Sequence, residues 1–207
     1  MATLTAYPML VALGAAVALV SFFIGAVNPA AIFARALGKD LSQGSGNPGA
    51  TNAGRVMGRK WGVLVGVLDV LKGVVPVLVV NFTLGMFFAY VAGFAAVLGH
   101  VYSPFLKGRG GKGVATALGA VLAVHPLIAG LLVAIFGLVF AVSRWVALSS
   151  VAAALGLIAV AIAAEFGVTW SGLQGWPSAV WAALLGGLII GRHRRNVADL
   201  PKRFPQP

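Results

Sequence analysis

The chain reads GHVYSPFLKGRGGKGVAT from Gly99 to Thr116, between two long apolar runs. Four of the six residues from Gly108 to Gly113 are glycine, and the other two are Arg109 and Lys112. Backbone without Cβ atoms lets successive N–H groups turn toward one anion. The next apolar run predicts a helix from about Gly113, whose N-terminal N–H groups also favour an anion. The stretch therefore predicts a phosphate site between two helices.

Two other interpretations of this stretch are possible. A nucleotide-binding Walker A loop requires Gly, four residues, then Gly-Lys and a Ser or Thr. Leu106 stands at the first glycine position and Gly113 at the hydroxyl position, so that loop is excluded. The other alternative is a flexible basic turn between membrane helices, which needs fewer glycines than are present.

The composition predicts an all-α integral membrane protein. Of 207 residues, 60% are hydrophobic and 9% charged, with a mean hydropathy of +0.99. A soluble domain carries about 25% charged residues. The absence of cysteine excludes disulfides, thiolate metal sites and a cysteine nucleophile. In so apolar a chain, the net charge of +11 indicates cytoplasmic loops and an anionic substrate, not nucleic acid.

The apolar runs predict a polytopic bundle of transmembrane helices. The expected spans are Pro8–Ala34, Trp61–Val80, Phe82–Leu98, Val114–Val142 in one or two pieces, Ala147–Ala164 and the short Ser178–Ile190. As one helix, Val114–Val142 would be about 43 Å long, beyond the roughly 30 Å of hydrocarbon. His125-Pro126 divides it into two short halves. Ser178–Ile190 either lengthens to include Trp176 and Pro177 or lies at the interface.

Charge placement predicts the orientation. Apart from Lys72 and Arg144, the other 13 of the 15 Lys and Arg residues lie in two polar loops and the tail. The positive-inside rule then predicts an odd number of crossings, the N-terminus outside and the C-terminus cytoplasmic. Seven crossings follow if His125-Pro126 separates two spans, and five if Val114–Val142 is one tilted helix. We expect seven, because that number also places Arg144 inside. The chain is predicted to be one membrane domain, 1–207, with cytoplasmic-side loops at 35–60, 99–113 and 192–207.

The first polar loop has its core at Gly44–Arg55, GSGNPGATNAGR. Small hydroxyl and amide residues form turns that donate to anions. Ser45, Thr51, Asn52 and Arg55 beside a membrane predict a second polar pocket, although a bland linker has a similar composition. Asn28-Pro29, near the inner end of the first span, predicts a kink or a residue that lines a site.

The second span contains Asp69 and Lys72. At spacing i, i+3 the two charges share a helix face and can pair. Ionisable groups at this depth are functional candidates by default. A structural ion pair is the alternative, and we expect Asp69 to orient a basic residue of the site.

The tail Arg192–Phe204, RHRRNVADLPKRF, brings His193, Arg194 and Asn196 to the same membrane face. By itself this segment is also typical of a basic patch that binds anionic lipid.

These segments together resemble a known family, the bacterial acyl-phosphate:glycerol-3-phosphate acyltransferases called PlsY. That family carries GSGNxGATNxxR in a first loop, a second loop that begins GH and ends GGKGVAT, and HRxN in the tail. This chain has Gly44–Arg55, Gly99–Thr116 and His193–Asn196 in the same order, and Asp69 to Gly73 match the DxxKG of the second span. The family usually has Glu immediately before the tail Asn, where this chain has Arg195.

The resemblance implies acyl transfer from a fatty acyl phosphate to the 1-hydroxyl of glycerol 3-phosphate. The products are lysophosphatidic acid and inorganic phosphate, the first step of bacterial phospholipid synthesis. It also implies a multi-pass protein of the bacterial cell membrane with its site on the cytoplasmic side, and neither metal nor cofactor. A phosphate or organic-anion transporter is the alternative, although we find no internal repeat of the kind transporters often have.

The resemblance also implies the site residues. The residues expected to act in catalysis are Ser45, Arg55, Lys112, His193 and Asn196. The residues expected to bind substrate phosphate are Gly44, Ser45, Asn47, Thr51, Asn52, Arg55, His100, Gly108, Arg109, Gly110, Gly111, Lys112, Gly113, Thr116, His193 and Asn196. Asp69 and Lys72 are expected to support them. The acyl phosphate is expected near Lys112, and glycerol 3-phosphate near Ser45 and Arg55.

An acyl phosphate is already activated, so direct attack by the glycerol hydroxyl needs no covalent enzyme intermediate. A serine nucleophile would need a base and an orienting group beside it. Three candidates for the general base stay open: His193, His100 and the bound phosphate itself. A His, four residues, Asp pattern, typical of acyltransferases that use thioester donors, is absent from this chain.

Overall fold

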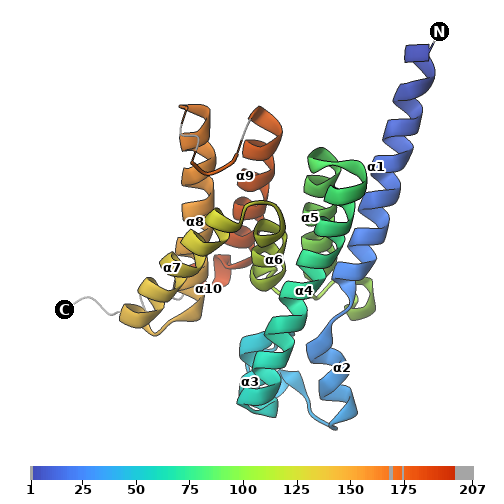
Figure 1. Ribbon diagram of the computed structural model, residues 1–207. Coiled ribbons are helices and arrows are strands. Elements are labelled where there is room, and N and C mark those ends of the chain that lie inside the picture. The colour runs from blue at the N-terminus through green and yellow to red at the C-terminus, as the bar shows by residue number, and fades with distance from the viewer. Residues whose placement is uncertain (1, 168–169, 174, 199–207) are drawn as a thin grey trace. The chain divides into compact units, whose positions relative to one another are not determined.

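The computed structural model describes residues 2–167, 170–173 and 175–198, and all regular structure within them is helical (Figure 1). This confirms the predicted all-α class. The chain forms two compact units, residues 1–124 and 125–207. Each is described by itself, and the single-domain organisation stays a prediction.

Five stretches of the described chain are long and apolar enough to cross a membrane. They are Tyr7–Ala36, Arg59–Leu84, Met86–Leu106, Pro126–Ser143 and Val146–Glu165. The chain is therefore polytopic, while the count of seven crossings and the orientation stay predictions.

Unit 1 contains six α-helices and two single-turn 3₁₀ helices. They are α1 (Ala2–Ala26), α2 (Pro29–Ala36), η1 (Leu41–Gln43), α3 (Ala50–Met57), α4 (Arg59–Leu84), α5 (Met86–Val101), η2 (Pro104–Leu106) and α6 (Val114–Val124). Helix α5 packs against α1 and α4, and α6 packs against α4. A Cβ atom on Gly73 of α4 would overlap the Thr116 carbonyl of α6. Small residues thus bring these two backbones together, as in many membrane helix pairs.

The predicted first span is broken where the sequence has Asn28-Pro29. Helix α1 ends at Ala26, and Asn28 has extended backbone angles. The Asn28 Oδ1 accepts the Ala31 N–H at 2.8 Å and caps α2, while Pro29 occupies the first helical turn. The last carbonyls of α1 consequently lack partners within the helix.

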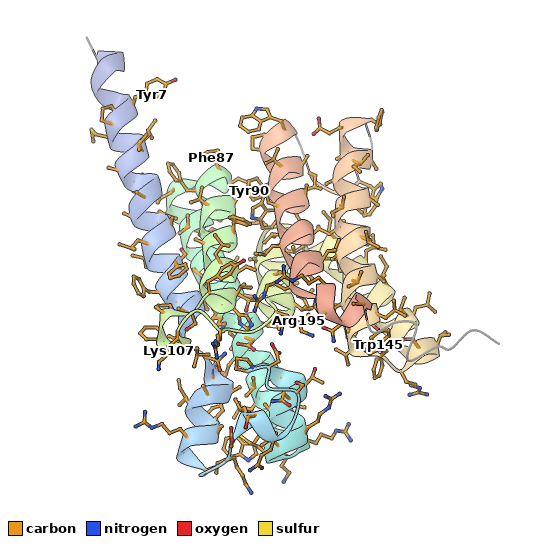
Figure 2. The ribbon with its side chains drawn as sticks, turned by 180° about the vertical axis from the view of Figure 1, so that it is seen from behind. Tyr7, Phe87, Tyr90, Lys107, Trp145 and Arg195 are labelled. Atoms are coloured by element: carbon orange, nitrogen blue, oxygen red, sulfur yellow. The ribbon has the colours of Figure 1, made fainter. Side chains whose placement is uncertain are left out.

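The polar segments gather at one end of unit 1. Helices α2 and α3 lie together at the end opposite the N-terminus of α1 (Figure 1). Their small core consists of Ala30, Ala53 and Val65, with Phe33, Leu41, Ala50 and Met57 packed against it. Figure 2 shows Lys107 of the glycine-rich stretch where α1 gives way to α2, and Tyr7 and Phe87 at the opposite end. Both predicted polar loops therefore belong to the same end of this unit.

The turn between the second and third predicted spans lies four residues later than those spans imply, at Gly85 and not at Asn81. Helix α4 continues past Asn81 to Leu84 and ends at Gly85, where φ is +86°. Asn81 fits within the helix, whereas Gly85 adopts the left-handed region that ends it.

Unit 2 contains α7 (Pro126–Ser143), α8 (Val146–Glu165), α9 (Gly175–Arg192) and α10 (Arg194–Ala198). Helix α8 packs against α7 and α9, and α10 contacts α8 and α9. The alternative of one continuous helix over Val114–Val142 is wrong, because His125 has non-helical angles and Pro126 begins α7. Helix α6 is consequently only about 16 Å long.

Candidate functional site

The first polar loop is held together by the side chain of Asn52. Its Oδ1 accepts the Ser45 N–H at 2.7 Å, and its Nδ2 donates to the Leu41 carbonyl at 2.7 Å. The Asn52 side chain is buried, and a Cβ atom on Gly44 would overlap its Oδ1. The sequence therefore needs both Asn and Gly here to fold the loop back onto α3.

The outer surface of this loop is made of polar side chains. Ser45, Thr51 and Arg55 are exposed, and Asn47 is half-buried. Helix α3 begins after Gly49, which has no side chain to cap it. The N–H groups of its first turn have no acceptor within the helix. Hydroxyl, guanidinium and helix N-terminus thus occur together on one short segment.

Asp40 stabilises the turn that leads into this loop. It caps η1 and accepts hydrogen bonds from the Ser42 N–H at 2.9 Å and from the Ser42 hydroxyl. These two bonds hold the pKa of Asp40 below its ordinary value of 3.8. Its role is structural, since it lies before the motif residues.

The glycine-rich stretch is built from backbone. The Gly110 N–H donates to the Val101 carbonyl at 3.1 Å, and the Gly111 N–H donates to the His100 carbonyl at 3.0 Å. Gly110, Gly111 and Gly113 are buried, and Lys112 between them is half-buried. The loop thus folds over the end of α5 and presents Lys112 immediately before α6.

The His100 ring lies directly against the glycine-rich loop. A Cβ atom on Gly111 would overlap Nε2 of that ring. On its other side, the Nδ1 atom lies 3.2 Å from the Thr116 hydroxyl of α6. The ring is buried. His100 therefore supports the loop from inside, and Thr116 lies behind it and not on the outer surface.

Asp69 and Lys72 form the predicted ion pair, with Oδ1 and Nζ 2.9 Å apart, which confirms the i, i+3 pairing. Only 2% of the Asp69 side chain and 8% of the Lys72 side chain are exposed, so the pair is buried. The same Asp69 oxygen lies 3.5 Å from Nδ1 of His100. The expected basic partner of Asp69 is thus His100.

Sequence reasoning missed the role of the α1–α2 break. Lys72 Nζ donates to the Val27 carbonyl at 2.7 Å, and the Ser103 hydroxyl donates to the Ala26 carbonyl at 2.7 Å. Asn28 Nδ2 donates to the Pro48 carbonyl of the first loop at 2.9 Å. Asn-Pro at a helix start was the signal, since the Asn side chain retains a free amide when its oxygen caps the helix.

The tail residues lie in unit 2. His193 follows α9 and is buried, and its Nδ1 lies 2.8 Å from the Ile189 carbonyl. A carbonyl only accepts, so Nδ1 donates and Nε2 of the neutral ring carries the lone pair. Asn196 lies half-buried on α10, whereas Arg195 is exposed. Figure 2 shows Arg195 and Trp145 at the same end of this unit. The tail beyond Ala198 falls outside the described residues.

An apolar groove of about 430 Å³ runs along α4. It is lined by Val63, Gly66, Val67, Val70, Leu71 and Ala115. Ala115 belongs to the first turn of α6, two residues after Gly113. A Cβ atom on Gly66 would lie 3.5 Å from Cβ of Ala50, the first residue of α3. The groove therefore extends from the point where the helices following both polar loops begin.

Both polar loops of unit 1, which contain Ser45, Arg55 and Lys112, belong to the same end of that unit, while His193 and Asn196 belong to unit 2. Among the described residues, no three His, Asp or Glu side chains group as a metal site. The individual roles expected for these residues stay predictions.

The comparisons with known proteins agree on one family. A family model described as glycerol-3-phosphate acyltransferase matches residues 15–203. The glycerol-3-phosphate acyltransferase of Aquifex aeolicus (strain VF5) is 38% identical over 185 residues, covering 87% of this chain and 91% of the relative.

Two crystal structures of PlsY (YgiH), an integral membrane glycerol 3-phosphate acyltransferase, are also similar. The glycerol 3-phosphate form has a TM-score of 0.82 and 36% identity, covering 91% of this chain and 92% of that one. The lysophosphatidic acid form has a TM-score of 0.78 and 35% identity over the same shares. The chain therefore belongs to the PlsY family of integral membrane glycerol-3-phosphate acyltransferases.

Proposed function

We propose that this enzyme transfers a fatty acyl group from acyl phosphate to the 1-hydroxyl of glycerol 3-phosphate, releasing lysophosphatidic acid and inorganic phosphate. The observation that carries the proposal is that unit 1 has two polar segments at one end, each suited to bind a phosphate. One exposes polar side chains, and the other consists of buried glycines around a lysine. Two phosphate-bearing substrates require two such segments. The family assignment favours this activity over the transporter alternative.

The first loop and the tail are proposed to hold glycerol 3-phosphate. Ser45 and Arg55 are exposed on one short segment and offer a hydroxyl and a guanidinium for its phosphate. His193 and Asn196 of unit 2 keep the role in binding this substrate that the family resemblance implies. The glycerol 3-phosphate form of the similar PlsY structure supports this substrate. Asn47 and Thr51 belong to the same surface, while Asn52 is proposed to shape the loop, since both ends of its amide are used there.

The glycine-rich loop is proposed to hold the acyl phosphate. The N–H groups of Gly108, Arg109, Gly110 and Gly111 donate to carbonyls within the protein, so the expected cradle of glycine N–H groups is wrong for these four residues. Lys112 with the N-terminal N–H groups of α6 would instead stabilise the charge of the leaving phosphate. Lys107 and Arg109, both exposed, would add long-range attraction. The alkyl tail would enter the apolar groove, because that groove starts at Ala115, next to this loop.

The chemistry is one acyl transfer. The glycerol 1-hydroxyl oxygen forms a bond to the acyl carbon, the bond from that carbon to the phosphate oxygen breaks, and phosphate leaves with the electron pair. The hydroxyl proton passes to a base. We favour His193 over His100, because the His100 ring is enclosed between Asp69, Thr116 and Gly111. The phosphate of the donor is the other candidate.

We also propose that the chain crosses the membrane seven times. Its N-terminus would lie outside, and its active site would lie on the cytoplasmic side of the bacterial membrane. Helix α6 is short, but Gly110, Gly111 and Gly113 immediately before it are also buried. The α7–α8 turn and the tail lie at the same end of unit 2 (Figure 2), which supports Arg144 on the tail's side. A cysteine replacing Arg144, in a chain with no other, would then be labelled only from inside. Labelling from outside would refute seven crossings.

The decisive experiment is an acyl-transfer assay on purified protein. We expect lysophosphatidic acid and inorganic phosphate in equal amounts from palmitoyl phosphate and glycerol 3-phosphate, without ATP and with chelator present. Palmitoyl-CoA should give little product, because the chain lacks the His, four residues, Asp pattern of thioester-using acyltransferases. Added inorganic phosphate should inhibit by occupying the glycine-rich loop. Efficient use of palmitoyl-CoA, or an absolute requirement for a divalent metal, would refute the proposed donor.

A further inference from the structure

A buried chain of contacts joins the two polar loops of unit 1. It begins at the first loop, where the Pro48 carbonyl accepts from Asn28 Nδ2 at 2.9 Å. The adjacent Val27 carbonyl accepts from Lys72 Nζ at 2.7 Å. Lys72 pairs with Asp69 at 2.9 Å. Both ends of the α1–α2 break are thus attached, one to the loop and the other to the ion pair.

The chain of contacts continues to the second loop. The Asp69 oxygen that pairs with Lys72 also lies 3.5 Å from His100 Nδ1. The opposite ring nitrogen of His100 faces Gly111 so closely that a Cβ atom there would overlap it. The Gly111 N–H donates to the His100 carbonyl at 3.0 Å. Ring and backbone of one histidine therefore fix the position of the residue before Lys112.

Charge neutralisation alone does not account for this arrangement. An ion pair that only neutralised two buried charges would be complete between Asp69 and Lys72, which lie on the same helix, α4. Instead each charge has a second partner from another segment, the Val27 carbonyl for Lys72 and the His100 ring for Asp69. Those two partners adjoin the two polar loops.

We propose that the Asp69–Lys72 pair is a positioning unit that holds the glycerol 3-phosphate loop and the acyl phosphate loop at a fixed separation. It rests on the function proposed above. Neither charge touches a substrate, since both side chains are buried beneath the loops. Their action is through Val27 and Asn28 on one side and through His100 and Gly111 on the other. Because each loop binds its own substrate, the pair affects the approach of the two reacting atoms more than either binding step.

The test uses the neutral double variant Asp69→Asn with Lys72→Met in the full-length protein. Replacing both members of a buried ion pair by neutral side chains is often harmless to stability, so a merely structural pair predicts activity near wild type. A positioning unit predicts a fall in kcat of about 100-fold, the effect of roughly 1 Å of misplacement. The KM values for glycerol 3-phosphate and for palmitoyl phosphate should each change less than about threefold. Glu165→Gln, an exposed carboxylate of unit 2, is the matched control and should leave all three constants unchanged.

A second variant breaks the chain of contacts elsewhere. Asn28→Ser keeps a side chain that caps α2 but removes the amide that reaches Pro48. It should show the same fall in kcat with little change in either KM. This variant decides the question if the double variant does not fold.

A distance measurement separates positioning from catalysis. Gln43 of η1 and Phe105 of η2 are both exposed, so cysteines there accept spin labels in a chain without other cysteines. We expect one narrow distance distribution in the otherwise native protein and a broader or displaced one in both network variants. An unchanged distribution, or a kcat within threefold of wild type in a folded variant, would overturn the proposal. Failure of the native protein to use acyl phosphate would instead refute the proposed function alone.

Discussion

The two polar loops of unit 1 are held in shape in opposite ways. The loop Gly44–Arg55 is shaped from inside by one side chain, Asn52, and exposes Ser45, Thr51 and Arg55. The loop Gly108–Gly113 is shaped by backbone bonds to the end of α5 and buries most of its glycines. One loop thus exposes polar side chains, and the other encloses its glycines and leaves Lys112 half-buried immediately before α6.

The two loops should therefore respond differently to substitution. In the loop Gly44–Arg55, removing a polar side chain should weaken substrate binding by about the free energy of the hydrogen bond that is lost. In the loop Gly108–Gly113, adding a side chain at a buried glycine should disturb the loop, because the new Cβ atom occupies space that neighbouring atoms already fill.

Lys112→Ala should have the largest effect, a loss of kcat of about 1,000-fold, at the upper end of what one electrostatic stabiliser contributes. Lys112 is the lysine among the glycines, and no backbone group can replace its positive charge. Initial rates with palmitoyl phosphate measure it. Expression and membrane insertion should be normal. Activity within a few-fold of wild type would make this loop a topological turn.

Gly111→Ala should cost about 100-fold in kcat by displacing the loop from the His100 ring. It should also lower the melting temperature, because the buried ring must move. Gly130→Ala is the matched control, since a Cβ atom there meets nothing within 4 Å. If both variants behave alike, the backbone description of this loop is wrong.

Ser45→Ala should raise the KM for glycerol 3-phosphate by roughly 10-fold or more, the value of one hydrogen bond to a charged group. The KM for acyl phosphate should be unchanged. The Ser45 N–H remains bonded to Asn52, because that bond uses backbone. Equal changes in both KM values would show that the first loop does not discriminate between the substrates.

Val67→Phe should narrow the apolar groove from an exposed position on α4. We expect kcat/KM for palmitoyl phosphate to fall several-fold relative to decanoyl phosphate, since a long tail loses burial that a short tail never had. If the ratio of kcat/KM for the two donors is the same in variant and wild type, the alkyl tail does not bind in this groove.

Arg195→Glu should have the smallest effect, less than about threefold on kcat/KM. Arg195 is exposed, and substitutions at exposed positions usually change stability by at most about 0.5 kcal/mol. The variant also restores the residue that the family usually carries. Loss of activity in a folded Arg195→Glu protein would show that the tail depends on this arginine.

Local sequence patterns were sufficient for much of the fold. Hydropathy located the five stretches of the described chain that are long and apolar enough to cross a membrane, and the Asn28-Pro29 and His125-Pro126 dipeptides marked two helix interruptions. The i, i+3 spacing of Asp69 and Lys72 gave their pairing because both partners lie on one helix. Membership of the family followed from three motifs in order and is confirmed.

The supporting contacts were beyond sequence reasoning. Lys72 reaches Val27 over 45 residues, and Ser103 reaches Ala26 over 77. Periodicity shows which face of a helix is polar but not which segment lies opposite it. Likewise, the side-chain amide of Asn52 is a group that can bind an anion. Only its two contacts within the loop reveal that it shapes the segment from within.

The ion pair of α4 also bears on how this protein enters its membrane. A nascent span leaves the translocon before its later neighbours exist, and one charge at its centre costs about 2.5–3.5 kcal/mol of insertion free energy. Because Asp69 and Lys72 are one turn apart on the same helix, they neutralise each other as soon as that turn forms. The helix thus carries its own counter-ion into the bilayer, and α4 can insert before His100 and α6 have been synthesised.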